Sequence, residues 1–144
     1  MKYRTVNPTI KYLSRALLMD LQIDEKFERI QQMRALAERR TAAYGHAAGG
    51  GGGAPDRRAD VVARIVDAER ELDAEINRML DAKAEIALAI ERVPDARMRL
   101  LLEMRYLNGY KWEYIAQKLE MSAQWTYTLH GRALEHVKKI LALD

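Results

Sequence analysis

The residues best suited to bind a ligand are polar side chains near the start of a C-terminal helix. Ala123, Gln124, Tyr127 and Thr128 follow Ser122 at helical spacing. Helix residues three and four apart lie on one face, so we expect these side chains to share a surface. Gln can pair in bidentate fashion with adenine, and hydroxyl groups can reach bases or phosphate oxygens. The pattern predicts contacts to double-stranded DNA.

The sequence does not indicate catalytic chemistry. His130 and His136 are six residues apart on one predicted helix and therefore face different ways, while His46 lies in another segment. There is no His-Glu-x-x-His pattern, and no Ser nucleophile has a partner in a known catalytic motif. The chain has no cysteine, which excludes disulfides and thiolate metal sites. We expect a protein that is not an enzyme and that has no metal site and no cofactor.

The DNA-contacting residues need a scaffold, and the surrounding sequence predicts one. Residues 111–119 form about two turns of helix, and a break over 120–122 follows, in which Ser122 is a good N-cap for the next helix. A short helix, a three-residue turn and a longer helix make a helix-turn-helix, whose second helix enters the major groove. Arg132 lies further along that helix and is expected to contact phosphate. The apolar side predicted for the second helix comprises Trp125, Leu129, Ala133, Leu134, Val137 and Leu141.

A further helix is predicted immediately upstream. It starts around Pro94, with proline in the first turn and Asp95 at the positive end of the helix dipole. It ends at Asn108-Gly109, because both residues tolerate left-handed backbone. Its predicted buried face comprises Met98, Leu101, Leu102 and Tyr106.

These segments resemble region four of bacterial sigma factors. The resemblance rests on Pro94-Asp95-Ala96-Arg97, Arg105-Tyr106-Leu107, Trp112-Glu113-Tyr114-Ile115-Ala116 and Arg132-Ala133-Leu134. It implies promoter DNA and RNA polymerase as partners. Nearly the whole chain is also similar to small phage and prophage proteins that carry the run Leu129-His130-Gly131-Arg132-Ala133-Leu134, which implies a bacterial host cell. Nothing resembles the promoter-melting part of a sigma factor.

The sequence departs from the sigma pattern in two places. Glu120 stands where the turn normally has glycine, so it must accept a left-handed backbone or change the turn. Lys111 stands where Ser or Thr usually caps the first helix, and losing a cap costs about 1 kcal/mol. The exposed recognition positions also hold few Arg and Lys residues. Together these features predict weak or partner-assisted DNA binding. Trp112 and Trp125 are expected in the core or half-buried, as large apolar side chains usually are.

Two long helices are predicted before residue 93. The first spans residues 9–42, with Ile23, Phe27, Ile30 and Ala37 as its apolar stripe. The second runs from Asp56 or Asp60 to Glu91. It has two apolar stripes. The first comprises Val61, Ile65, Ala68, Leu72, Met79, Ile86 and Val93, and the second comprises Val62, Val66, Ile76 and Leu80. Two stripes suggest that this helix packs on the first helix and on a second neighbour, either the C-terminal unit or another copy of the chain.

The connector between these helices holds five consecutive glycines, Gly49 to Gly53. We expect residues 44–55 to be a disordered linker, since nothing regular survives such a run in water. A phosphate-binding loop would need a Gly-Lys-Ser/Thr ending, and this run ends Gly-Ala-Pro-Asp.

The sequence therefore predicts an all-α protein with a long antiparallel helical hairpin at 1–93 and a sigma-region-four-like helix-turn-helix at 94–144. Residues 55–93 carry seven Lys/Arg against ten acids, so the hairpin's second helix is a poor phosphate-binding face. No apolar run approaches the ~18 residues of a membrane span, and no signal peptide is evident. We expect a cytoplasmic phage or prophage transcription regulator. Two alternatives stay open: an oligomerising assembly or adaptor protein, and a DNA-packaging recognition subunit.

Overall fold

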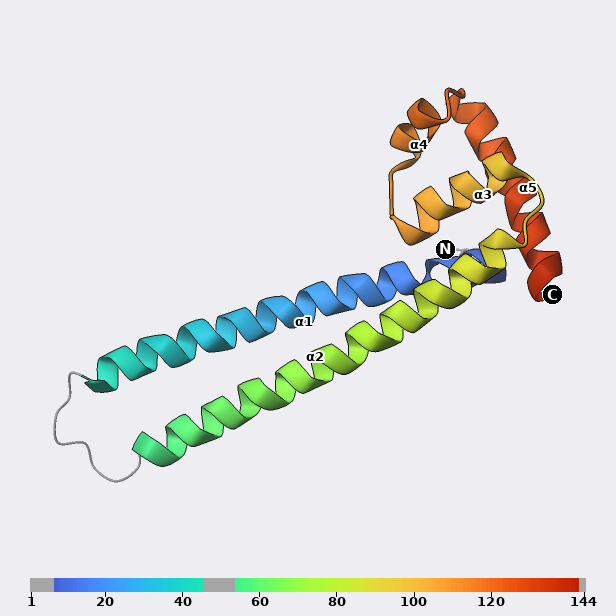
Figure 1. Ribbon diagram of the computed structural model, residues 1–144. Coiled ribbons are helices and arrows are strands. Elements are labelled where there is room, and N and C mark those ends of the chain that lie inside the picture. Colours follow the sequence, from blue (N-terminus) through green and yellow to red (C-terminus); the bar gives the residue numbers. More distant parts are fainter. Residues whose placement is uncertain (1–6, 46–53, 143–144) are drawn as a thin grey trace, which may run out of the picture. The chain divides into compact units, whose positions relative to one another are not determined.

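The structure is a computed structural model that describes residues 7–45 and 54–142. The described residues form helices joined by short turns and contain no strand, which confirms the all-α prediction (Figure 1). The elements are α1 (Pro8–Gly45), α2 (Ala54–Glu91), α3 (Ala96–Leu102), the π-helical segment η1 (Glu103–Leu107), α4 (Trp112–Lys118) and α5 (Ala123–Leu141). In this part of the chain, no helix has the length and apolar character that crossing a membrane requires.

Both long helices extend further than the sequence predicted. Tyr44 and Gly45 end α1, while Ala54 and Pro55 begin α2, so these four residues of the predicted linker are helical instead. Proline fits the first turn of a helix because it has no N–H to leave unbonded there, which explains the early start of α2. The rest of the predicted linker, including Gly49 to Gly53, lies outside the described residues.

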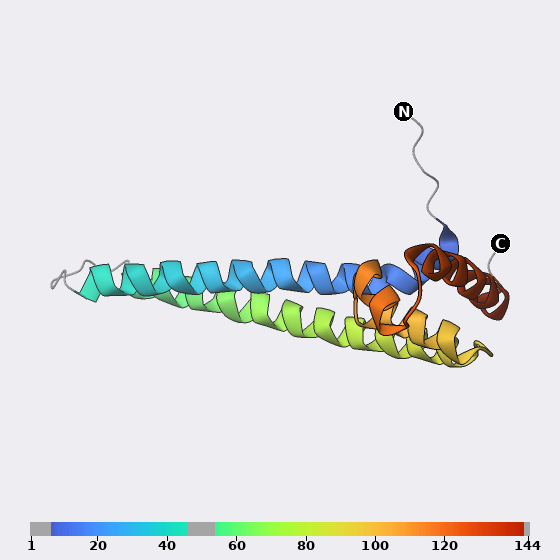
Figure 2. The same cartoon turned by 90° about the horizontal axis from the view of Figure 1, so that it is seen from above.

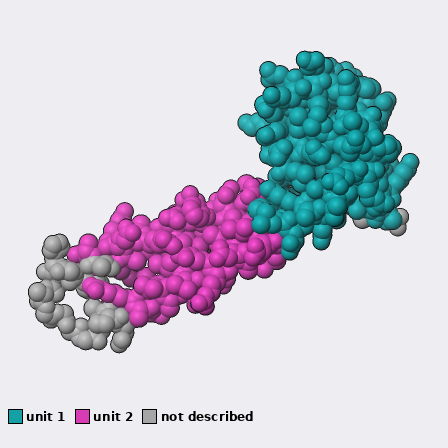
Figure 3. Space-filling view, in the orientation of Figure 1, with its two compact units in different colours: residues 1–19, 79–144 teal, residues 20–78 magenta. Residues whose placement is uncertain are grey.

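The chain forms two compact units (Figure 3). Unit 2 comprises residues 20–78, and within it α1 and α2 lie side by side (Figure 2). Lys26 forms an ion pair with Glu75, and Arg34 forms one with Glu69. The partner on α2 moves towards its N-terminus as the residue on α1 moves towards its C-terminus. The two helices are therefore antiparallel within this unit.

The seam of unit 2 follows a seven-residue repeat. Ile23 and Ile30 of α1 and Leu72 of α2 are buried. Phe27, which was predicted in the same stripe, is 49% exposed, so that prediction is wrong. A seven-residue spacing keeps residues 23 and 30 on the seam, whereas Phe27 is four residues beyond the first of them and lies on the flank. In the second predicted stripe of α2, Val62, Val66 and Leu80 are exposed.

Unit 1 comprises residues 1–19 and 79–144 and holds a continuous apolar core. The start of α1 and the end of α2 contribute to this core together with α3, η1, α4 and α5. Burial of that many apolar side chains is the main source of stability for such a small unit. The buried members are Leu13, Ala16, Ala82, Ile86, Ile90, Val93, Met98, Leu101, Leu102, Tyr106, Ile115, Leu129, Ala133, Leu134 and Val137.

The helix before the candidate site begins and ends at defined signals. Asp95 is the N-cap of α3, and its carboxylate accepts a hydrogen bond from the backbone N–H of Met98 at 2.9 Å. Pro94 therefore precedes the cap, and its predicted place in the first turn is wrong. At the other end, Asn108 caps η1 and Gly109 takes φ +70°, which confirms the predicted helix end. A Cβ on Gly109 would lie 3.2 Å from Leu17 Cδ2, so both backbone conformation and space favour glycine there.

Candidate nucleic-acid interface

The turn between α4 and α5 is a Schellman motif. The N–H of Met121 donates to the carbonyl of Ala116 at 2.9 Å, and the N–H of Glu120 donates to that of Gln117 at 3.2 Å. This pairing satisfies carbonyls at the end of α4 and requires a left-handed residue directly after the helix cap. Glu120 is that residue, with φ 54°. Of the two outcomes that the sequence allowed for Glu120, the structure has the left-handed backbone.

Replacing Glu120 with glycine is expected to raise the free energy of unfolding by about 1 kcal/mol, because glycine adopts positive φ without a Cβ clash. Denaturant unfolding followed by circular dichroism would measure the change. The matched control is Glu135→Gly at an exposed, interior position of α5, where the same substitution should destabilise by about 1 kcal/mol. If glycine destabilised the protein by a similar amount at both positions, the backbone at Glu120 would not be strained.

The two helices that flank this turn begin differently. Ser122 is the N-cap of α5, and its hydroxyl accepts a hydrogen bond from the backbone N–H of Trp125 at 3.1 Å, which confirms the predicted cap. Lys111 is the N-cap of α4 and makes no side-chain capping bond. The start of α5 is therefore the better-fixed of the two, and it carries the predicted DNA-contacting residues.

The inner face of α5 differs from the prediction at one position. Trp125 was predicted on the apolar side but is 41% exposed, and Thr126 is buried in its place. Both residues fit helical spacing to Leu129, so periodicity alone did not separate them. Thr126 can be buried because its hydroxyl donates to the carbonyl of Ser122 at 2.8 Å and is not left unpaired. Trp112, expected in the core or half-buried, is half-buried.

The outer face of α5 presents the predicted site residues to solvent. Ser122, Ala123, Gln124, Tyr127, Thr128 and Arg132 are all exposed. The hydroxyl of Thr128 donates to the carbonyl of Gln124 at 3.1 Å, so this hydroxyl is already engaged with its own helix. Gln124 and Tyr127 are three residues apart and therefore lie on the same side of the helix.

A guanidinium and an indole extend this surface. Arg132 lies over the ring of Trp125, with 5.1 Å from its guanidinium carbon to the ring centroid. The contact positions the cation beside the exposed face of α5 without neutralising its charge. The pair was not predicted, although the sequence indicates it: Arg132 follows Trp125 by seven residues, or two helical turns, on the same side of the helix.

Behind the outer face, His130 joins three elements. Its Nε2 lies 2.6 Å from the hydroxyl of Tyr106 in η1, and its ring meets that of Trp112 in α4 edge-on at 4.5 Å between centroids. Burial lowers the pKa of His130 from 6.5 to about 4, and the positive charge of Arg105 acts in the same direction. Burial also raises the pKa of Tyr106 to about 12. At neutral pH the phenol is therefore protonated and the imidazole neutral, so Tyr106 can donate to Nε2.

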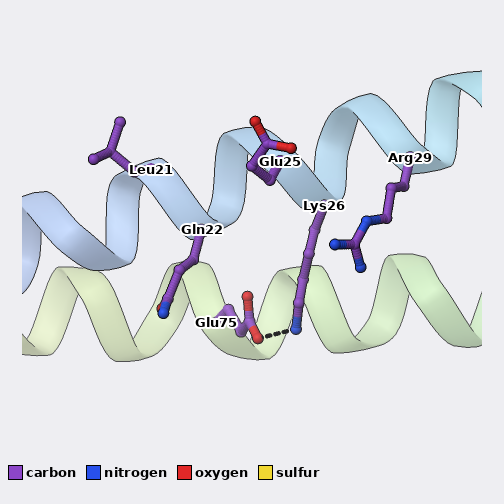
Figure 4. A pocket seen from close by; sticks show the side chains of 6 residues that line it. All are labelled: Leu21, Gln22, Glu25, Lys26, Arg29 and Glu75. Carbon is purple, nitrogen blue, oxygen red and sulfur yellow. Dashed lines mark hydrogen bonds and ion pairs between the residues drawn. The ribbon is translucent and has the colours of Figure 1, made fainter.

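Unit 2 contains a groove of about 420 Å³, which we call the polar groove (Figure 4). The Lys26–Glu75 ion pair spans it, and the second carboxylate oxygen of Glu75 is buried without a hydrogen-bond partner. Cations and carboxylates alternate around this open groove, so it does not present one sign of charge to a ligand. Its lining residues are Leu21, Gln22, Glu25, Lys26, Arg29 and Glu75. Nowhere in residues 7–45 and 54–142 do three or more His, Cys, Asp or Glu side chains gather as a metal site would require.

Comparison with known proteins gives a single match. A family model described as a protein of unknown function, DUF1492, matches residues 40–138. No curated protein and no solved structure matches the chain. The matched range covers all of α2, α3, η1 and α4, and it reaches Lys138 in α5.

Proposed function

The chain belongs to the DUF1492 family of proteins of unknown function, and we propose that it is a DNA-binding transcription regulator that uses α4 and α5 as a helix-turn-helix. The observation that carries the proposal is the geometry of this segment. A Schellman turn at Glu120 and a hydroxyl cap at Ser122 fix the start of a 19-residue helix. The outer face of that start is polar and exposed, as a helix that reads base edges must be.

The residues of this face divide by role. Gln124 would read an adenine through paired hydrogen bonds in the major groove. Tyr127 would contact a base edge or a phosphate oxygen, and Arg132 would contact phosphate. The face holds one cation among its six residues, so the non-specific electrostatic part of binding would be small.

The resemblance to sigma region four supports a role at promoters, with RNA polymerase as a second partner. Region four is the part of a sigma factor that binds promoter DNA and contacts polymerase. The similarity to small phage and prophage proteins supports a phage-encoded regulator that acts in the host cytoplasm.

Binding to native upstream DNA and to random DNA across a salt series tests the proposal. Specific binding that weakens with rising salt is the expected result, because contacts to phosphate release counterions. The slope should be shallow, since the face holds one cation. If native and random fragments bind equally weakly even at low salt, the proposal is wrong in its simple form. Pull-down of purified polymerase then separates a polymerase-dependent factor from the assembly or adaptor protein.

We also propose that unit 2 mediates self-association, through a surface that we call the apolar flank: Phe27, Val62, Val66 and Ile76. Arg34 pairs with Glu69, so in antiparallel helices the residue seven before Arg34 lies beside the residue seven after Glu69. This register places Phe27 beside Ile76. Val62 is two heptads before Ile76 and therefore on the same side of α2, and Val66 is one turn further along that side.

The apolar flank needs a partner because unit 2 buries little by itself. Among its described residues only Ile23, Ile30 and Leu72 are buried apolar side chains. Long helices depend on tertiary packing for their stability, and three buried residues are few for a pair of this length. A second copy packed on the apolar flank would give a four-helix arrangement with a shared core.

Replacing both Phe27 and Val66 with glutamate is expected to shift dimerisation to at least about tenfold higher concentration, because charged side chains are excluded from interface cores. Light scattering across a concentration series would measure the shift. The control variant carries Leu21→Glu and Leu36→Glu, two exposed leucines of α1 outside the apolar flank, and should associate like the parent. Equal effects of the two variants would place the interface elsewhere, and a ring-sized assembly on DNA would favour the packaging subunit.

A further inference from the structure

A small hollow lies between α4 and α5, next to the face proposed to read DNA. Its volume is about 50 Å³ and its lining residues are Trp112, Glu113, Ala123, Thr126 and Tyr127. The rings of Trp112 and Tyr127 lie 5.5 Å apart and tilted by 51°. Ala123 and Tyr127 also belong to the exposed outer face of α5, so the hollow is continuous with that face.

The chemistry of the hollow is largely apolar. Two aromatic rings and the methyl of Ala123 contribute to it. The hydroxyl of Thr126 already donates to the carbonyl of Ser122, so its proton is not free to bind a ligand. Glu113 is the one charged group, and a carboxylate repels phosphate. The hollow is therefore unsuited to a phosphate and is too small for a whole base.

We propose that this hollow receives the C5-methyl group of a thymine in the DNA site, an inference that rests on the proposed function. The thymine methyl is the apolar group that base pairs present in the major groove, and small apolar side chains contact it in protein–DNA complexes. Its size suits a hollow of about 50 Å³. Ala123 and Gln124 are neighbours in the chain, so this thymine lies in the same base pair as the adenine read by Gln124 or in the next one.

Deoxyuridine substitution tests the proposal with a single-group change. A bound DNA fragment is first mapped by footprinting, and each thymine in the footprint is then replaced in turn by deoxyuridine, which lacks only the methyl. Burying one such group corresponds to a change of about fourfold in affinity. We expect one thymine whose replacement weakens binding by this amount.

Two protein variants locate the effect. Ala123→Leu fills the hollow and is expected to abolish the difference between thymine and uracil at that position. Gln117→Ala changes an exposed residue of α4 that does not line the hollow, and it should keep the difference.

The outcomes separate this inference from the proposed function. A chain that binds native DNA no better than random DNA overturns both. If binding is specific but replacing each thymine by deoxyuridine never weakens it, the methyl site alone is overturned. A sensitive thymine that Ala123→Leu leaves sensitive moves the methyl contact out of this hollow and also overturns the inference.

Discussion

Replacing Gln124 and Arg132 together with alanine is expected to weaken specific binding to the native site by about 10- to 1000-fold. A bidentate glutamine–adenine pair contributes about 1–3 kcal/mol of discrimination, and a phosphate contact adds to overall affinity. Losing one phosphate contact should also reduce the slope of log affinity against log salt by about one. Fluorescence anisotropy with labelled DNA at several salt concentrations measures both quantities.

The matched control removes the same two residue types elsewhere. Gln117 in α4 and Arg97 in α3 are exposed and lie outside the six-residue face. The variant with alanine at both positions should bind like the parent. If the Gln124→Ala, Arg132→Ala variant also bound like the parent, the outer face of α5 would not be the DNA-reading surface.

Acidification is expected to destabilise unit 1 through His130. The folded chain holds the pKa of this imidazole at about 4, below its ordinary value of 6.5. Well above pH 6.5 the ring is neutral in both the folded and the unfolded chain, so His130 contributes no pH dependence to the free energy of unfolding. Between pH 6.5 and 4, His130 binds a proton in the unfolded chain but stays neutral in the folded chain, so the free energy of unfolding falls. Because water reaches part of the ring, we expect a loss of about 2 kcal/mol rather than the full value of the shift.

Unfolding by denaturant at a series of pH values from 7.5 to about 4 would measure this loss. The His130→Gln variant lacks the titrating ring and should lose about 2 kcal/mol less stability on acidification than the parent. The control Thr128→Gln changes an exposed residue of the same helix that has no titrating group, and it should retain the parent's pH dependence. Parallel curves for the parent and His130→Gln would show that His130 is not the source.

Helix caps, helix ends and the turn at Glu120 could be predicted from the sequence. The Ser122 cap and the helix end at Asn108-Gly109 depend on one or two residues of restricted chemistry, and the structure confirms them. Glu120 stands where the turn usually has glycine, so either its backbone is strained or the turn differs. Its φ is positive, so the backbone is left-handed. Such features follow from backbone sterics and hydrogen bonding within a few residues, so neighbouring residues suffice to predict them.

Features set by packing over long distances were not readable. The residues near Trp125 do not indicate that Thr126 is the buried residue. Which of the two is buried depends on how α5 is rotated against α3 and α4. Phe27 fits the apolar spacing of its helix, and its exposure depends on the register with α2. The π-helical form of η1 likewise has no marker in its residues Glu103–Leu107.

The positions of the two tryptophans give the molecule an intrinsic optical probe. Trp112 and Trp125 are the only tryptophans in the chain, and both lie in the α4–α5 segment. Trp112 contacts His130, whose protonation changes the charge beside the indole, whereas Trp125 lies on the outer surface beneath Arg132. Light selectively absorbed by indole therefore excites only this segment, and its emission follows changes there without a label or a contribution from the tryptophan-free unit 2.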